Sequence, residues 1–125
     1  MCTRITMTYP DEAMAQLFGA AWGNDLPEVP RFNICPTNPV AVVTSDTGRR
    51  LRSMRWGFVP DWYKALNDGP LILNARSETV AEKPAFRAAI RERRCIVPAA
   101  GFYEWSAGPN ATRRSEEHTS EIQSL

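Results

Sequence analysis

The sequence comprises 125 residues, of which 43% are hydrophobic, and it carries a formal net charge of +1. This size and composition suit one packed domain and exclude a disordered polymer. No apolar run approaches the roughly 20 residues that cross a bilayer, and no secretion signal opens the chain, so we expect a soluble cytoplasmic protein with no membrane partner.

The first third of the chain is predicted to form a strand, a helix and a loop. Residues 2–8 alternate loosely, as a strand does, and Thr8 is placed to cap the following helix with Asp11 three positions on. The helix is expected to close near Gly23. Its apolar face is predicted from side chains at positions i, i+3, i+4 and i+7, namely Met14, Leu17, Phe18 and Ala21. Four prolines within residues 26–39 indicate an extended loop.

The remaining elements are predicted from β-branched runs, turn residues and helical periodicity. In chain order they are strands at 40–44 and 51–58 joined by a turn at 46–48, an aromatic turn at 60–66, a brief strand at 71–73, a helix over 84–93 and strands at 95–98 and 101–105. Together they predict an α+β fold with mostly antiparallel strands.

The last residues differ in character from those before them. Residues 114–125 read RSEEHTSEIQSL and show no periodicity. The string is similar to the translation of a common sequencing adapter. We therefore predict that the natural sequence is cut off near Arg113, so that residues 1–113 are a partial domain and residues 114–125 are a non-native tail. A genuine acidic, disordered tail is the alternative. The single histidine, His118, lies in this stretch and is assigned no role.

Cysteine at position 2 is the first candidate for chemistry. Removal of the initiator methionine would leave an amine and a thiol on adjacent carbons, with ordinary pKa values of about 8 and about 8.5. Such an aminothiol condenses with an aldehyde, for example a ring-opened abasic sugar, to an imine and then a thiazolidine. It could instead release a short leading peptide as an N-terminal nucleophile, or be inert. Cys2, Cys35 and Cys95 form no CxxC pair, so no metal site, cofactor or disulfide framework is predicted.

Two polar side chains near strand ends are further candidates. Asn74 follows a brief apolar strand and, with Arg76, is presented at its end. Glu104 stands between Tyr103 and Trp105. If Glu104 were buried there, its protonated form would be favoured and would suit proton transfer during imine formation. An outward-facing Glu104 and a turn-capping Asn74 are equally open alternatives.

Arginines and aromatic residues are interleaved along the chain. Thirteen of the 15 basic residues are arginine, whose guanidinium binds phosphate through two hydrogen bonds. This favours an anionic partner, although solvated surface arginines are the alternative. Trp62, in a polar turn, is a candidate for stacking on an exposed base, a contact worth about 1 to 3 kcal/mol. Trp56 is expected to pack in the core.

Several segments together resemble the SOS response-associated peptidase (SRAP) family over residues 1–113. They are MCTR at 1–4, RFNICP at 31–36, WGFVPDW at 56–62, NARSET at 74–79, CIVP at 95–98 and GFYEW at 101–105. The resemblance implies a mostly β fold, an SRAP-like sheet or barrel with flanking helices, truncated at its C-terminal side. It also implies a role in the DNA-damage (SOS) response: sensing of abasic sites, a covalent DNA–protein crosslink, and a thiol autopeptidase activity that exposes Cys2.

The resemblance also implies roles for the matching residues. Cys2 would be the nucleophile, Asn74 would orient the amine or the opened sugar, and Glu104 would act as acid and base. The DNA groove would be lined by Arg4, Asn33, Trp62 and Arg76. The partner would be single-stranded DNA containing abasic sites, bound by a monomer in the bacterial cytoplasm and at the nucleoid.

Two features depart from the family pattern. Thr3 stands where the family usually has Gly, which adds a side chain beside Cys2 without removing its chemistry. The family's catalytic histidine belongs to a downstream segment that residues 1–113 do not contain, so we expect this chain to be weak or inactive.

Two other functions use fewer of these residues. In a non-covalent single-strand-binding module Cys2 would be incidental, and affinity would come from the arginines and aromatic residues. A cysteine protease that acts on other proteins would need a His or Asp partner, and none can be named within residues 1–113.

Overall fold

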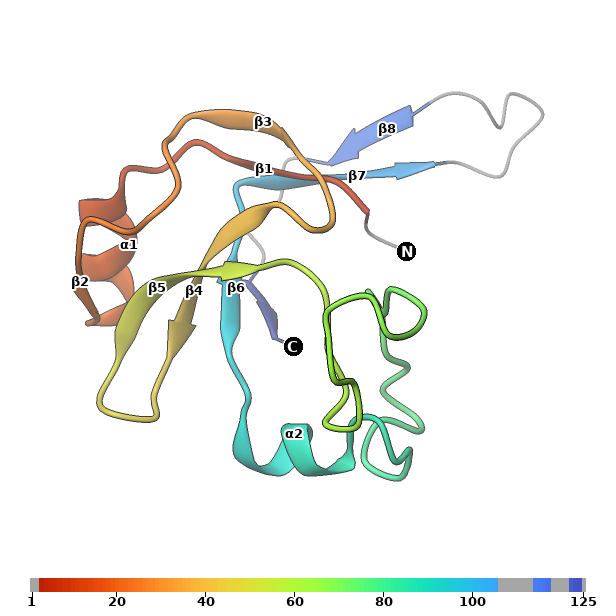
Figure 1. Cartoon of the computed structure of the whole chain (residues 1–125). Coiled ribbons are helices and arrows are strands. Elements are labelled where there is room, and N and C mark those ends of the chain that lie inside the picture. The colour runs from red at the N-terminus through yellow and green to blue at the C-terminus, as the bar shows by residue number, and fades with distance from the viewer. Residues whose placement is uncertain (1–2, 106–113, 118–121, 125) are drawn as a thin grey trace.

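The computed structural model describes residues 3–105, 114–117 and 122–124, which form two β-sheets and two helices (Figure 1). The helices are α1 (Asp11–Phe18) and α2 (Arg87–Glu92). The strands, in chain order, are β1 (Ile5–Met7), β2 (Ala21–Trp22), β3 (Arg31–Ile34), β4 (Pro39–Thr44), β5 (Arg50–Arg55), β6 (Ile96–Pro98), β7 (Gly101–Trp105), β8 (Arg114–Glu117) and β9 (Ile122–Ser124).

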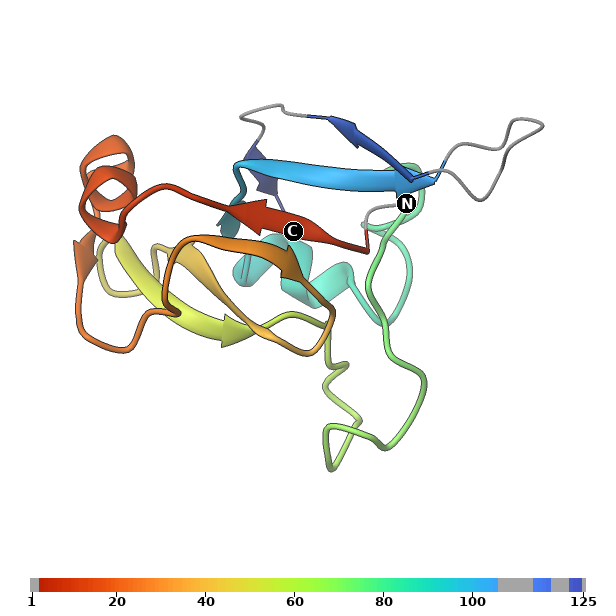
Figure 2. The same ribbon diagram turned by 90° about the horizontal axis from the view of Figure 1, so that it is seen from above.

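The strands form two sheets rather than one closed barrel. The first sheet has the order β3-β1-β7-β8 and is antiparallel throughout. The second has the order β2-β5-β4-β6-β9, in which the β2–β5 pair is parallel and the other pairs are antiparallel. Short connections at residues 35–38 and 99–100 carry the chain directly from one sheet to the other (Figures 1 and 2). The predicted α+β, mostly antiparallel fold is confirmed, and the barrel alternative is wrong for the described strands.

The core lies between the two sheets and is closed on one side by α1. Its buried residues are Ile5, Met7, Met14, Ala15, Ile34, Val40, Val42, Val43 and Leu51. Leu51, which lies opposite Val43 on the neighbouring strand, is only 2% exposed. Trp56 is partly buried and packs against this cluster, as the sequence predicts.

Helix α1 starts later and ends earlier than the sequence predicts. Its N-cap residue is Pro10, in an extended conformation with no capping side chain, so the predicted Thr8 cap is wrong. The helix ends at Gly19, whose left-handed φ of 58° is easy for a residue without Cβ. The predicted end near Gly23 is therefore also wrong, because the chain has already entered β2, which pairs with β5.

The predicted apolar face of α1 is confirmed in part. Met14 is buried and Phe18 packs against the core, whereas Leu17 is 74% exposed and Ala15 is buried instead. The early end at Gly19 removes Ala21 from the helix, so the expected i+7 position does not exist there. The helix rests on the core through its first two turns.

Elements with a clear local pattern of turn residues or alternation match the predictions best. The hairpin of β4 and β5, the turn after Pro60 and strands β6 and β7 are confirmed. Within the predicted loop at 26–39 the structure has β3, and at 71–73 it has only a single bridge from Ile72 to Phe58. Helix α2 begins at Arg87, after turns that occupy the predicted first residues.

Two strands lie in the predicted tail. β8 pairs with β7, and β9 pairs with β6. The origin of residues 114–125 as a non-native tail stays a prediction, and His118 lies outside the described residues. Within the part of the chain that is described, no helix combines the length and apolar content needed to span a membrane.

Candidate functional site

The start of β1 lies between two neighbouring strands at one end of the first sheet. Ile5 faces Ile34 of β3 on one side and Phe102 of β7 on the other. One residue earlier, the backbone oxygen of Arg4 accepts a hydrogen bond of 3.0 Å from Tyr103 N–H. This hydrogen bond ties the backbone of Arg4, a predicted groove residue, to β7, and Arg4 is half-buried. Cys2, the predicted nucleophile, lies outside the described residues, two positions before Arg4.

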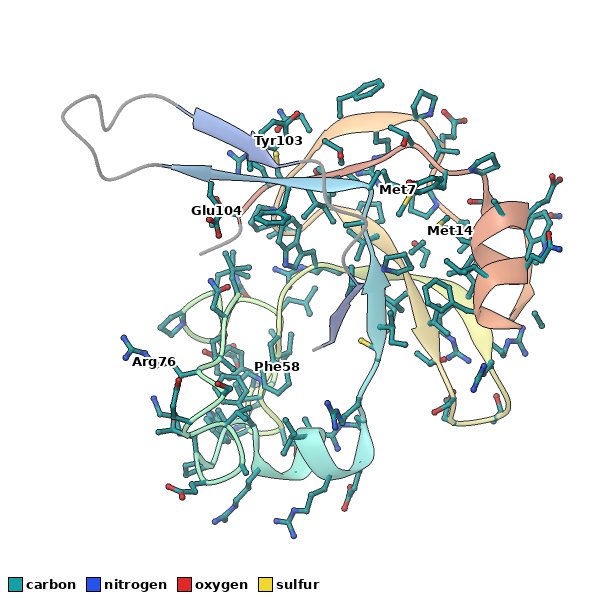
Figure 3. The ribbon with its side chains drawn as sticks, turned by 180° about the vertical axis from the view of Figure 1, so that it is seen from behind. Met7, Met14, Phe58, Arg76, Tyr103 and Glu104 are labelled. Atoms are coloured by element: carbon teal, nitrogen blue, oxygen red, sulfur yellow. The ribbon has the colours of Figure 1, made fainter. Side chains whose placement is uncertain are left out.

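Glu104 lies at this same end of the sheet. It follows Tyr103 along β7, and the two side chains project from opposite faces of the strand (Figure 3). Glu104 is exposed. Of the two alternatives that the sequence leaves open, the outward-facing carboxylate is the one present, because alternation places the buried position at Tyr103.

Tyr103 is a positioning residue that the sequence does not single out. It is 7% exposed, and its hydroxyl donates a hydrogen bond of 3.0 Å to the backbone oxygen of Phe32. This bond runs from β7 to β3 across the intervening β1. The strand that carries Glu104 is thereby fixed relative to the strand that carries Asn33. The available signal was the alternation itself, since a tyrosine beside an exposed carboxylate faces inward.

Replacing Tyr103 with Phe removes only this hydroxyl, and we expect it to lower the free energy of unfolding by about 1 kcal/mol. Urea denaturation of both proteins measures the change. Tyr9, 47% exposed, provides the matched control, and Tyr9→Phe should change the stability by less than about 0.5 kcal/mol. Equal effects of the two substitutions would show that the Tyr103 hydroxyl does not tie the strands together.

The connection from β3 to β4, residues 35–38, lies at the same end of the first sheet, on the side of β3. The Asn38 side-chain oxygen accepts a bond of 3.0 Å from Cys35 N–H, and the Trp56 backbone oxygen accepts one of 2.8 Å from Thr37 N–H. Thr37 has a φ of 76°, a left-handed conformation that is costly for a residue with a branched Cβ. Asn33 is exposed, and its backbone and side-chain oxygens lie 3.7 and 3.8 Å from the Cys35 thiol.

The predicted stacking residue Trp62 lies on a separate loop region that follows β5. Trp62 is 59% exposed, and its ring lies edge-on to Tyr63 with centroids 6.5 Å apart. The Tyr63 hydroxyl donates to the backbone oxygen of Pro70 (3.0 Å), and the Asp68 carboxylate accepts a bond of 2.6 Å from Lys64 N–H. These hydrogen bonds join residues within the segment 63–70, and the Trp62 indole beside it faces solvent.

Asn74 and Arg76 lie further along the same loop region, and both are exposed. They follow the bridge in which Phe58 N–H donates to the Ile72 oxygen at 2.8 Å. Figure 3 shows the Arg76 side chain extending outward from this region. Figures 1 and 2 both place the region on the side of the molecule where β1 begins and β7 ends. The structure thus places Arg4, Asn33 and Glu104 at one sheet end, and Trp62, Asn74 and Arg76 on a loop region at the same side of the molecule.

Two further observations concern metal ligands and cysteine reactivity. Within residues 3–105 and the two described tail segments, no group of three or more His, Cys, Asp or Glu side chains is placed to hold a metal ion. Burial raises the pKa of the Cys95 thiol above its ordinary value, so this cysteine is a poor nucleophile near neutral pH.

Comparison with known proteins shows relatives over most of this chain. The abasic site processing proteins YoaM and YoqW of Bacillus subtilis (strain 168) are 41% and 37% identical to this chain over 85 and 109 residues. These matches cover 67% and 84% of this chain but only 37% and 48% of the relatives, so the chain spans less than half of their length. A crystal structure of a protein from Bacteroides thetaiotaomicron has the same fold, with a TM-score of 0.73, 24% identity, and coverage of 99% of this chain and 58% of that chain.

A family model described as SOS response associated peptidase (SRAP) matches residues 1–122. The match extends over nearly the whole chain and includes the strands β1, β3 and β7 described above. The chain belongs to the SOS response associated peptidase (SRAP) family.

Proposed function

We propose that this chain processes abasic sites: Cys2, once exposed as the terminal residue, captures the ring-opened sugar in single-stranded DNA and becomes covalently attached to it. The observation that carries the proposal is the register at the start of β1. Cys2 is joined through Thr3 to Arg4, and Arg4 is hydrogen-bonded to the residue that precedes Glu104. The names of the relatives YoaM and YoqW support the same substrate.

The chemistry needs only the terminal residue and a proton carrier. The free amine of Cys2 attacks the sugar aldehyde to give a carbinolamine, which loses water to form an imine. The thiolate then adds to the imine carbon, the nitrogen takes up a proton, and a five-membered thiazolidine closes. The overall reaction joins aminothiol and aldehyde and releases one water. The same thiol, by attacking the preceding peptide carbonyl, would allow hydrolysis of that peptide bond and expose the amine.

Glu104 is proposed to accept a proton from the attacking amine and then to protonate the carbinolamine hydroxyl, which leaves as water. Its carboxylate is solvent-accessible and lies on the strand that borders Arg4, within the region where the sugar would be held. Asn74 is proposed to orient the amine or the opened sugar. The DNA is proposed to run over Arg4, Asn33, Trp62 and Arg76.

Glu104→Gln keeps the shape of the side chain and removes the proton carrier, so we expect crosslinking to slow on the order of a hundredfold, the usual loss for a general acid–base. The rate is measured from the crosslinked fraction over time on denaturing gels. Glu92→Gln, at an exposed position on α2, is the matched control and should leave the rate unchanged. Similar rates for the two variants would remove Glu104 from the reaction.

The function itself is tested by incubating the chain with a single-stranded oligonucleotide that contains one abasic site. We expect a crosslinked band on a denaturing gel, weaker than the band from full-length YoqW, because the chain spans less than half of that protein. Borohydride reduction of the abasic aldehyde beforehand should abolish the band. A band that persists after the abasic aldehyde has been reduced would contradict the proposal, and a band as strong as that of YoqW would contradict the expected impairment.

A second candidate is a non-covalent single-strand-binding module. The observation in its favour is Trp62, an indole that is 59% exposed on a loop tied by internal hydrogen bonds. Such a module would bind the reduced and unreduced oligonucleotides equally, with an affinity that falls as salt rises. The covalent reaction, by contrast, depends on the aldehyde.

A further inference from the structure

The aromatic turn that follows β5 carries an exposed indole on a buried anchor. Tyr63 N–H donates a hydrogen bond of 3.0 Å to the backbone oxygen of Pro60, so residues 60–63 form a reverse turn with Trp62 as its third residue. Pro60 is fully buried, whereas Trp62 is 59% exposed. The turn is thus fixed to the interior at its first residue and presents the indole to solvent two residues later.

Tyr63 also closes the loop that follows this turn. Its hydroxyl donates a hydrogen bond of 3.0 Å to the backbone oxygen of Pro70, which joins the two ends of the loop. Inside the loop, one carboxylate oxygen of Asp68 accepts hydrogen bonds from the backbone N–H groups of Lys64 (2.6 Å) and Ala65 (3.1 Å). The loop is therefore closed both at its ends and within.

The ring of Tyr63 packs directly on Gly69. A Cβ at Gly69 would lie 2.6 Å from Cζ of the Tyr63 ring and closer still to the hydroxyl oxygen. The φ of Gly69 lies outside the left-handed range, so the approach of the ring, and not the backbone conformation, is what requires glycine here. The same ring meets the Trp62 indole edge-on, with centroids 6.5 Å apart and 68° between the planes. Tyr63 therefore links Trp62 to Gly69 and Pro70.

Local contacts set the shape of this loop. Figure 2 shows the chain after β5 extending away from both sheets. Between residues 61 and 71 only Tyr63 and Gly69 are half-buried, and the other residues are exposed. An exposed loop with few contacts to the core opens readily unless its own bonds restrain it. The two half-buried residues are the pair in contact, so this pair is the restraint next to Trp62.

We propose that Tyr63 is a positioning residue, which holds the Trp62 indole in the orientation that stacks on an unpaired base of the DNA strand. This inference rests on the proposed function, because it takes Trp62 as a DNA contact. Binding loses affinity when a side chain must first be ordered, and an indole that is already in place avoids that cost. Tyr63 acts through Trp62, so it affects DNA binding and not the covalent step at Cys2.

The test compares binding with chemistry. Affinity is measured by fluorescence anisotropy with a labelled single-stranded oligonucleotide that lacks an abasic site, and the crosslinking rate is measured on denaturing gels at saturating abasic DNA. Trp62→Ala should weaken binding roughly five- to 150-fold, the value of one stacked base. Tyr63→Phe, which removes only the hydroxyl, should weaken binding about threefold, as if the competent orientation fell to a third of the population. Tyr63→Phe should leave the saturating crosslinking rate unchanged.

Coupling to Trp62 separates positioning from a general loss of structure. In the Trp62→Ala background, Tyr63→Phe should have no further effect on affinity, because no indole remains to be positioned. Gly69→Ala, which forces the Tyr63 ring away, should weaken binding at least as much as Tyr63→Phe. Gly23→Ala is the matched control, because a Cβ at Gly23 would meet only an ordinary contact of 3.6 Å with Asp25 Oδ1, and it should leave the affinity unchanged.

Equal losses of affinity from Tyr63→Phe in the presence and absence of Trp62 would overturn the inference, as would an affinity that neither Tyr63→Phe nor Gly69→Ala changes. An unchanged affinity in Trp62→Ala would overturn it as well, because no stacking would depend on Tyr63. Each of these results leaves capture by Cys2 standing if the crosslink still forms. Absence of the crosslink, with the coupling between Tyr63 and Trp62 intact, would instead contradict the capture and support the positioning role.

Discussion

Replacing Cys2 with alanine is expected to abolish the crosslink that survives a denaturing gel. The variant keeps its terminal amine, so it still forms an imine with the abasic aldehyde, but no thiolate is present to close the ring. An imine hydrolyses reversibly, and the product should therefore disappear when the protein is denatured in water. Borohydride added during the incubation should rescue a covalent product, because it reduces the imine to a stable amine.

Cys35→Ala is the matched control for this substitution. Cys35 lies on the connection from β3 to β4, with its thiol 3.7 Å from the backbone oxygen of Asn33. Of Cys35 and Cys95, the two cysteines that the structure describes, Cys35 lies next to the proposed site. Its loss should leave the crosslinked fraction unchanged. If Cys35→Ala removed the crosslink and Cys2→Ala did not, the nucleophile would be assigned to the wrong cysteine.

Leu51→Ala is expected to cost about 3 kcal/mol of the free energy of unfolding, a typical loss for a leucine truncated in a closed core. Leu51 is 2% exposed and lies opposite Val43, on a strand of the second sheet that has a neighbour on either side. The truncation removes buried apolar surface and leaves a cavity that flanking strands can fill only partly. Urea denaturation followed by circular dichroism measures the change.

Met54, on the same strand as Leu51, is 46% exposed and provides a matched control. Met54→Ala should cost less than about 1 kcal/mol, because most of the removed surface already faces water. A similar loss for the two variants would mean that β5 does not bury one face in the core.

The sequence predicts best those elements that carry their own local signals. The β4–β5 hairpin has its turn residues and its alternating strands within one short stretch. β3 was missed because prolines flank it and its partner, β1, lies far back in the sequence. β2 was missed because Ala21 continues the helical periodicity, while Gly19 ends the helix through a left-handed conformation that the pattern does not reveal.

The family resemblance is confirmed, but the sequence could not decide how the site residues are oriented. Both a buried and an exposed Glu104 fit the string Phe-Tyr-Glu-Trp, and only the register of β7 against β1 settles which face it occupies. The hydrogen bond from Tyr103 to Phe32 joins residues 71 positions apart. No local pattern predicts such a contact.

The most direct test of the proposed capture is the intact mass of the crosslink together with the state of the amino end. We predict that the reactive protein lacks Met1, that the crosslink equals protein plus DNA minus one water, and that peptide mapping places the DNA on Cys2. A protein that keeps Met1 or an acetylated amino end, and still joins abasic DNA at the same rate, would contradict ring closure on a free aminothiol.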